Sequence, residues 1–175
     1  LMLGEIRDPE TARVAMSAAG TGRVLMTTLH SKDAVGCLTA LRNWGIDDFQ
    51  MASALRVVVA QRLVRKLCET CRELVDGPSN AERDWLDMLG RGVPEQLYRP
   101  VGCEKCNGLG YSGRTGIFEV WRVGAEDADH ILDRKSDQWM RRHLAEIGHR
   151  FMIDDALSKV ARGITDLRHV RQLTS

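Results

Sequence analysis

Four of the five cysteines in this chain form two pairs with the same spacing. Cys68 and Cys71 make one Cys-x2-Cys pair, and Cys103 and Cys106 make the second. Two residues between ligands let one tight turn direct both thiolates to one point, and two such turns complete a tetrahedron around Zn²⁺. We therefore predict a metal site with these four ligands. Because protein thiolates fill every position on the ion, the zinc would be structural rather than catalytic.

Disulfides or four unrelated buried thiols are the alternative explanations of these cysteines. A reducing cytoplasm disfavours disulfides, and the paired spacing disfavours unrelated thiols. Cys37 has no partner at this spacing, and we expect it to be a core residue. Residues 103–110 also read Cys-x-x-Cys-x-Gly-x-Gly, a motif of the cysteine-rich region of DnaJ-type chaperones. The first cysteine pair is not followed by those glycines, so the repeat that this alternative needs is missing.

Glu5 and His30 are the other candidates for chemistry, because each follows a short apolar or uncharged run. Residues 1–3 precede Glu5, and residues 24–29 precede His30. Ligands of open α/β sheets bind where strands end. A carboxylate there can orient or deprotonate an attacking water and help to fix Mg²⁺, and a histidine can sense a terminal phosphate. Taken singly, each residue also fits an ordinary surface position at a strand end.

The elements around Glu5 and His30 indicate an α/β fold. Asp8 can cap a helix that has Pro9 at its first position, and Gly20 can end it. Residues 24–29 carry no charge, as expected of a strand buried on both faces of a parallel sheet. A second helix is predicted over residues 32–44. Strand, helix, strand and helix in this order are typical of the α/β class.

The rest of the chain alternates loops with shorter predicted elements. A short helix from Asp47 leads into a strand over residues 56–67, and a loop-rich stretch contains a helix near residues 81–89. A strand follows over 115–121, and then helices over 136–147, 153–162 and 166–172, the last behind a Thr165 cap. We divide the chain into residues 1–67 as a core, 68–110 as the cysteine module, and 111–175 as a strand with helices.

Composition excludes several classes of partner. The 175 residues carry a net charge of +1, so no basic surface predicts a direct nucleic-acid partner. One basic cluster, residues 62–66, fits a solvated strand edge. No run is long and apolar enough for a transmembrane segment, and no signal peptide is visible, so we expect a soluble, cytoplasmic protein. The chain begins with Leu1 inside an apparent strand, and we expect it to be part of a longer protein.

Two stretches of sequence resemble boxes of one known family. Residues 4–12 (GEIRDPETA) and 21–34 (TGRVLMTTLHSKDA) are similar to the Walker B and His boxes of bacterial type II secretion and type IV pilus assembly ATPases. The resemblance covers essentially the whole chain, in order. It continues through the cysteine pairs and through residues 61–68 (QRLVRKLC), 110–119 (GYSGRTGIFE), 154–160 (DDALSKV) and 163–165 (GIT).

The resemblance implies a RecA-like ATPase domain followed by a tetracysteine zinc module and a helical C-terminal subdomain. It also implies a hexameric motor that uses ATP and Mg²⁺ on the cytoplasmic face of the inner membrane, with secretion or pilus platform proteins as partners. By match, Glu5 is the catalytic acid and His30 the second histidine of the His box. Arg7 is carried over, by a weaker match, as a charge sensor. Related retraction motors lack the cysteines, which favours the assembly or secretion branch.

The sequence departs from the family pattern at two points. Arg23 stands where the family has the first histidine of its box, so a nucleotide-sensing donor is permanently charged. No Gly-x4-Gly-Lys-[Ser/Thr] loop occurs in the 175 residues, so a cradle for the phosphates is missing. We therefore expect the isolated chain to be inactive and its parent to be an ATPase. The alternative is a zinc-stapled binding or docking module without nucleotide chemistry.

Overall fold

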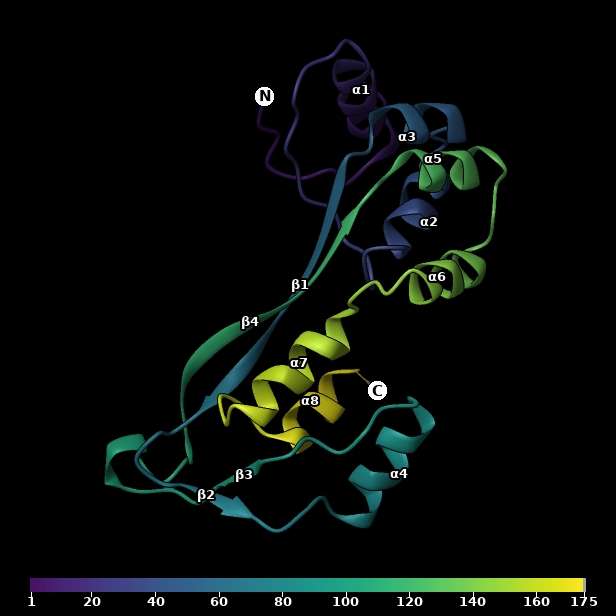
Figure 1. The fold of residues 1–175 in the computed structure, drawn as a ribbon. Coiled ribbons are helices and arrows are strands. Elements are labelled where there is room, and N and C mark those ends of the chain that lie inside the picture. The colour runs from purple at the N-terminus through teal and green to yellow at the C-terminus, as the bar shows by residue number, and fades with distance from the viewer. Residues whose placement is uncertain (175) are drawn as a thin grey trace. The chain divides into compact units, whose positions relative to one another are not determined.

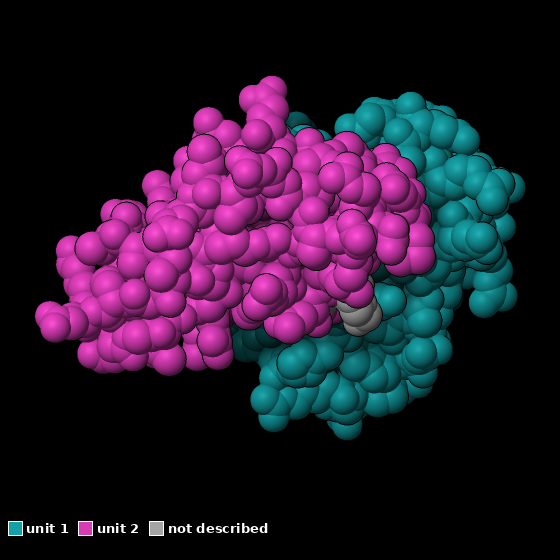
Figure 2. All heavy atoms as spheres, turned by 90° about the horizontal axis from the view of Figure 1, so that it is seen from below, with its two compact units in different colours: residues 1–60, 119–150 teal, residues 61–118, 151–175 magenta. Residues whose placement is uncertain are grey.

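The computed structural model describes residues 1–174, which fall into two compact units. Unit 1 contains residues 1–60 and 119–150, and unit 2 contains residues 61–118 and those from 151 onward; Figure 2 colours the two units separately. Two long strands, β1 (Val57–Leu67) and β4 (Tyr111–Arg122), pair with each other and contribute residues to both units. The mixture of helices and strands confirms the predicted α/β class.

Unit 1 is built mainly from helices (Figure 1): α1 (Pro9–Gly20), α2 (Gly36–Asn43), α3 (Asp48–Ala54), α5 (Ala125–Leu132) and α6 (Asp137–Glu146). Helix α3 packs against α1, α2 and α5, and α2 packs against α6. The core of this unit consists of apolar side chains with almost no exposed surface, among them Ala12, Leu38, Leu41, Met51, Trp121, Ile131 and Met140.

The predicted start of the first helix is confirmed. The Asp8 side chain accepts a hydrogen bond from the Thr11 backbone N–H at 2.8 Å, and Pro9 occupies the first turn. The next helix, predicted from residue 32, begins instead at Gly36. Asp33 accepts a hydrogen bond from the Gly36 N–H at 2.7 Å, and the chain before α2 forms turns rather than helix.

The two predicted parallel strands are present only as extended segments. Met2 and Met26 form one parallel bridge, and the neighbouring Leu3 N–H donates to the Met26 carbonyl at 2.9 Å. The expectation that residues 24–29 are buried on both faces is wrong for this structure, because Val24 is 80% exposed and Met26 is 63% exposed. Among the described residues, no further strand pairs with either segment.

In the described part of the chain, unit 2 contains a two-stranded antiparallel sheet and three α-helices. Strand β2 (Arg72–Val75) pairs with β3 (Leu97–Pro100), with Arg72 opposite Pro100 and Val75 opposite Leu97. The helices are α4 (Asn80–Met88), α7 (Met152–Ala161) and α8 (Leu167–Thr174). Helix α8 packs against α4 and α7, and α7 also packs against β3. Their shared core includes Val64, Trp85, Leu86, Ile117, Ala156 and Val160.

The cap predicted for the last helix is wrong by one residue. Asp166, not Thr165, accepts a hydrogen bond from the His169 backbone N–H, at 2.9 Å. Among the described residues, the buried Thr165 hydroxyl has no hydrogen-bond partner. A carboxylate is the stronger acceptor at a helix N-terminus because the helix dipole favours negative charge there.

Candidate functional site

Backbone hydrogen bonds bring Glu5 and His30 together. The Ile6 N–H donates to the Thr28 carbonyl at 2.8 Å, and the Thr28 hydroxyl donates to the Gly4 carbonyl at the same distance. Glu5 lies between the two bonded residues of the first segment, and His30 follows Thr28 by two residues on the second. The two side chains therefore lie at the same edge.

Glu5 has a basic partner on each carboxylate oxygen. Its Oε1 lies 2.8 Å from Nε2 of His30, and its Oε2 lies 2.5 Å from Nη2 of Arg7. The hydrogen bond from Arg7 is the main reason that the pKa of Glu5 lies below its ordinary value, and the charges of Arg7 and His30 act in the same direction. Glu5 is thus an ionised acceptor suited to align a water molecule and a cation.

The exposure of the three side chains differs. The Glu5 side chain is only 20% exposed, whereas those of Arg7 and His30 are 78% and 94% exposed. Glu5 is therefore held in place while its two partners remain accessible.

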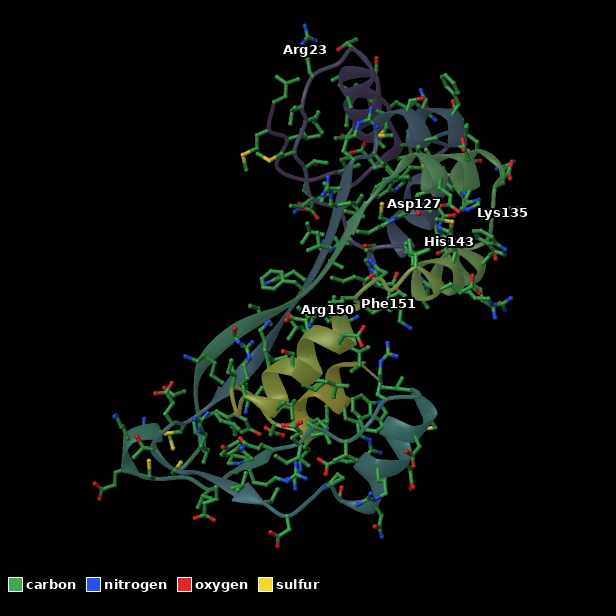
Figure 3. The ribbon with its side chains drawn as sticks, in the orientation of Figure 1. Arg23, Asp127, Lys135, His143, Arg150 and Phe151 are labelled. Carbon is green, nitrogen blue, oxygen red and sulfur yellow. The ribbon has the colours of Figure 1, made fainter. Side chains whose placement is uncertain are left out.

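The structure places Arg23 away from these contacts. Arg23, labelled in Figure 3, follows α1. It lines a shallow hollow of about 440 Å³ together with residues of that helix, including Arg13 and Ser17. Among the described residues, no ion pair joins Arg23 to Glu5 or His30. The structure thus brings together three of the four nucleotide-site candidates.

The second candidate site is formed by the two cysteine pairs in unit 2. Cys68 follows β1, and its backbone N–H donates to the Gly110 carbonyl at 2.9 Å, so the first turn is fixed to the end of the second. Cys103 caps the short 3₁₀ helix η1 (Glu104–Cys106), and Cys106 is the last residue of that helix. The turn is tight: a Cβ on Gly102, where φ is 109°, would lie 2.5 Å from the Gly108 carbonyl oxygen.

The four sulfur atoms converge on one point. The Sγ atoms of Cys68 and Cys103 are 4.0 Å apart, and Sγ of Cys106 lies 3.8 Å from that of Cys71 and 3.8 Å from that of Cys103. Four thiolates around one zinc ion at about 2.3 Å would be separated by about 3.8 Å. These residues therefore fit a tetrahedral metal site.

Backbone donors around the sulfurs also suit thiolates. The N–H groups of Cys103 and Gly110 each donate to Sγ of Cys106 at 3.2 Å, and these bonds lower the pKa of Cys106 to about 6. A hydrogen bond from the Thr70 backbone lowers the pKa of Cys68, whereas desolvation raises that of Cys71 to about 11. Two of the four sulfurs are thus already disposed to carry the negative charge that a metal requires.

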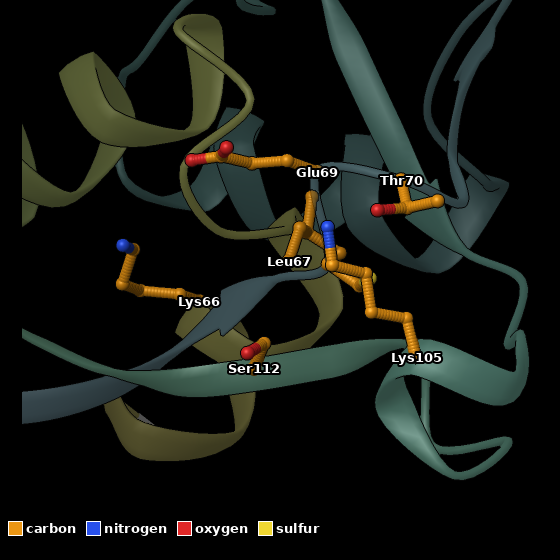
Figure 4. Close-up of a pocket in the computed structure, with 7 residues that line it drawn as sticks. Lys66, Leu67, Glu69, Thr70, Lys105 and Ser112 are labelled. Atoms are coloured by element: carbon orange, nitrogen blue, oxygen red, sulfur yellow. The ribbon is translucent and has the colours of Figure 1, made fainter.

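A small cavity of about 220 Å³ adjoins the first cysteine pair (Figure 4). It is lined by Lys66, Thr70, Lys105 and Ser112, together with Leu67, Cys68 and Glu69. The two lysines come from different cysteine pairs: Lys66 precedes Cys68, and Lys105 precedes Cys106. They place positive charge next to a cluster that would carry four thiolates.

Sequence reasoning missed the polar contacts that support the cysteine module. Tyr111 donates from its hydroxyl to Oδ2 of the buried Asp166 at 2.5 Å, and Arg72 donates to the Gly163 carbonyl. The Leu67 N–H also donates to the Ile164 carbonyl, at 2.9 Å. These partners are separated by many residues along the chain, so only the buried aspartate before a helix could have signalled the contact.

In the described part of the chain, no helix has the length and apolar composition needed to cross a bilayer.

The sequence is similar to proteins of known role. It is 42% identical over 176 residues to the "Type II secretion system ATPase E" of Vibrio cholerae. The matched region covers 99% of this chain and 34% of that protein. It is 38% identical over 180 residues to the "Type IV pilus assembly ATPase PilB" of Acinetobacter baylyi. That match covers all of this chain and 30% of that protein.

The fold is also similar to solved ATPase structures. The structure of the Legionella pneumophila ATPase DotB matches with a TM-score of 0.63 and 21% identity, over 98% of this chain and 37% of that one. The Yersinia pseudotuberculosis ATPase DotB matches with the same TM-score and 20% identity, over 99% of this chain and 36% of that one. The chain spans about a third of the length of these proteins.

Residues 1–172 match the sequence profile of the family described as "Type II/IV secretion system protein". The curated relatives that match nearly the whole chain are secretion and pilus assembly ATPases. The chain therefore belongs to the type II/IV secretion system protein family.

Proposed function

We propose that this chain is the part of a type II secretion or type IV pilus assembly ATPase that carries the acidic side of the nucleotide site. The observation that carries the proposal is the position of Glu5 between His30 and Arg7, in a chain that belongs to this family. In this role, the extended segments of unit 1 belong to a RecA-like core that the rest of the parent protein completes.

Each residue at this edge has a separate proposed role. Glu5 orients the attacking water, or accepts its proton, and helps to hold Mg²⁺. His30 and Arg7 are nucleotide sensors: both contact Glu5 and are largely exposed, so a bound phosphate can compete with the carboxylate for them. Arg23 is proposed as a further sensor that the parent protein brings to the nucleotide. ATP with Mg²⁺ supplies the phosphoryl group that is transferred to water.

The cysteine module is proposed to be a structural zinc site. Sulfur separations of 3.8 to 4.0 Å and backbone donors to Sγ support Zn²⁺ bound by Cys68, Cys71, Cys103 and Cys106. We keep the division into a core (1–67), a zinc module (68–110) and a C-terminal subdomain (111–175) as a description of these functional segments. Zinc in this position fixes the module and takes no part in hydrolysis.

The remaining proposals concern the longer protein. We propose that it is a hexamer that works in the cytoplasm, next to inner-membrane platform proteins of a secretion or pilus system. The similarity to secretion and pilus assembly ATPases supports a role in one of these systems. Because the 175 residues contain no phosphate-binding loop, we propose that this chain alone does not hydrolyse ATP.

The test of the nucleotide role is Glu5→Gln in the longer protein. The change keeps size and polarity but removes the charge that aligns the water, so turnover should fall about a hundredfold or more while ATP binding persists. His30→Ala should reduce hydrolysis less steeply, because it removes a sensor. Glu10→Gln is the matched control, since Glu10 is an exposed acid at the start of α1. A Glu5→Gln protein that hydrolyses ATP at the normal rate would contradict the proposal.

A zinc-stapled docking module without nucleotide chemistry is the second candidate. The convergence of the two cysteine pairs, which needs no nucleotide, is the observation that favours it. It predicts that Glu5→Gln and His30→Ala both leave turnover of the longer protein near wild type and shift stability by about 1 kcal/mol. ATPase rate and melting temperature, measured side by side, separate the two functions.

A further inference from the structure

Two histidines and a carboxylate meet between α5 and α6 in unit 1, in a cluster separate from both sites described above. Glu126 and His130 are four residues apart on α5 and therefore share one face of that helix. His143 comes from α6. The possible ligand atoms of these three side chains all lie within 4.8 Å of one another.

Three polar atoms in and beside this cluster are buried without hydrogen bonds. Among the described residues, Nε2 of His130, Nε2 of His143 and Oδ1 of Asp127 have no hydrogen-bond partner. The nearest approaches are 3.7 Å from His130 Nε2 to Glu126 Oε1 and 3.6 Å from His143 Nε2 to Asp127 Oδ1, both beyond hydrogen-bond length. Buried polar atoms normally have a partner, so these atoms point to a missing one.

The two imidazoles are held in position by packing. The ring of Trp139 stacks on His143 with a centroid distance of 5.3 Å and an interplanar angle of 13°. The same indole meets His130 at 4.4 Å and 66°, and the two histidine rings are 4.6 Å apart at 77°. Rings fixed in this way lose little freedom when they bind an ion, which favours binding.

Asp127 adds a fixed negative charge beside the histidines (Figure 3). Its Oδ2 accepts hydrogen bonds from the Gly124 N–H at 2.9 Å and from the indole N–H of Trp121 at 3.2 Å. The carboxylate is therefore held in one orientation, with Oδ1 toward His143. It can serve as a further ligand or hold the imidazole in the correct orientation.

We propose that Glu126, His130 and His143 bind a divalent first-row transition ion, with Zn²⁺ as the natural candidate, and that Asp127 supports the site. Imidazole nitrogens and carboxylate oxygens are ligands that this ion accepts. Tetrahedral binding needs ligand atoms about 3.3 Å apart, so the cluster must contract. Glu126 makes this possible because its side chain is 73% exposed and free to swing inward. The ion would join α5 to α6.

Ion pairs between the histidines and their carboxylates are the alternative explanation of the cluster. The nearby Lys135 has its printed contacts outside the three ligands: its ammonium lies 5.4 Å from the centroid of the Trp139 ring and 3.7 Å from a carboxylate oxygen of Asp133. Ion pairs alone predict no saturable metal uptake at the cluster. The two explanations therefore differ in a direct measurement.

The test is a calorimetric titration of Zn²⁺ alone into the full 175-residue chain, whose zinc content has first been measured after gel filtration. We expect one saturable equivalent beyond the tightly held metal, and shifts of the His130 and His143 ring resonances in NMR spectra over the same range. His130→Ala should weaken this uptake at least about tenfold, and Glu126→Gln should weaken it less. Asp129→Asn is the matched control, because it removes an exposed acid from the same helix outside the cluster.

Three outcomes decide the matter. Loss of the extra equivalent in His130→Ala, with uptake by Asp129→Asn unchanged, supports the site. Uptake that is the same in His130→Ala and wild type overturns it, as does a wild-type titration that shows no extra equivalent. If the His130→Ala chain fails to fold, the NMR spectra of the wild-type chain decide, since ring resonances that do not move on saturation also overturn the proposal.

Discussion

At the scale of single residues, Glu82 is a buried acid whose carboxylate has several partners. It is 3% exposed, and its carboxylate accepts hydrogen bonds from Arg99 and, at 2.8 Å, from both the backbone N–H and the hydroxyl of Ser79. Burial by itself would raise the pKa of Glu82, but the hydrogen bonds from Arg99 and Ser79 outweigh it and hold the pKa below its ordinary value. Glu82 thus caps α4 and pairs with β3 at once.

Glu82→Gln should destabilise the chain by about 1–3 kcal/mol at pH 7, because it leaves the half-buried Arg99 guanidinium without its charged partner. The wild-type contribution is complete above the unfolded pKa of about 4.3 and is lost as pH falls through the lower folded pKa. The stability of wild type should therefore fall more steeply below about pH 5 than that of the variant. Urea unfolding at several pH values measures this difference.

Asp84→Asn is the control for Glu82→Gln. Asp84 lies on the same helix and is exposed, so its loss should change stability by less than about 0.5 kcal/mol. Equal slopes against pH for wild type and Glu82→Gln would show that the buried pair contributes nothing through its charge.

Local spacing explains which site residues could be predicted. The short, equal spacing within each cysteine pair made the metal site predictable. The uncharged runs before Glu5 and His30 made these two residues candidates. His130 and His143 carry no such signal, because their cluster depends on how α5 packs against the rest of unit 1. The contacts of Asp166 and Glu82 with Tyr111 and Arg99 depend in the same way on tertiary structure.

At the scale of elements, the turn of the second cysteine pair depends on two glycines with different requirements. Gly102 has φ of 109°, and a Cβ there would lie 2.5 Å from the Gly108 carbonyl oxygen. Gly108 has φ of 76°, but a Cβ there would meet nothing within 4 Å. Gly102 is thus needed both for its backbone conformation and for the close approach, whereas Gly108 is needed only for the first.

Gly102→Ala should therefore lower the melting temperature and weaken zinc binding more than Gly108→Ala. Backbone strain alone costs about 1 kcal/mol in either variant, and the clash in Gly102→Ala adds to it by displacing the turn that holds Cys103 and Cys106. Competition with a colorimetric zinc chelator, followed with thermal melts, compares the two variants. If both variants bind zinc equally well, close backbone approach is not what shapes the turn.

Helices were easier to predict than strands, for reasons visible in particular segments. Asp8, Pro9 and Gly20 mark the ends of α1 with local chemistry, and the structure has the helix there. The run over residues 24–29 has the composition of a buried strand, yet strand burial needs neighbours, and within this chain Val24 and Met26 are exposed. Strand β4, which pairs with β1, begins at Tyr111, earlier than the predicted residue 115.

At the scale of the whole molecule, each compact unit combines two stretches that are far apart in the sequence. Local patterns describe consecutive segments, so they cannot indicate that residues 119–150 join residues 1–60. The chain passes from one unit to the other within β1 and within β4, and both strands therefore have residues in both units. The cysteine module lies at the end of these strands in unit 2, where Cys68 follows β1 and Gly110 precedes β4.

The last prediction concerns zinc removal in the intact chain. Cys103→Ser should abolish stoichiometric, tightly held zinc and lower the melting temperature by at least about 5 °C, because metal binding is itself folding free energy. Hydrogen exchange should rise in residues 68–75 and 97–112, whose turns the metal joins. Helices α2 and α6, which pack together in unit 1, should keep their protection.

Cys37→Ala is the matched control, because Cys37 is a buried thiol of α2 in unit 1. It should lower stability through lost packing, by about 1 kcal/mol or more, and leave zinc content unchanged. A stability loss of similar size without metal loss separates ligation from simple packing. Freshly prepared, reduced wild-type protein without any bound metal would contradict the prediction, because the four thiolates would then hold no ion. A Cys103→Ser chain that keeps its zinc would also contradict it, because Cys103 would then not be a required ligand.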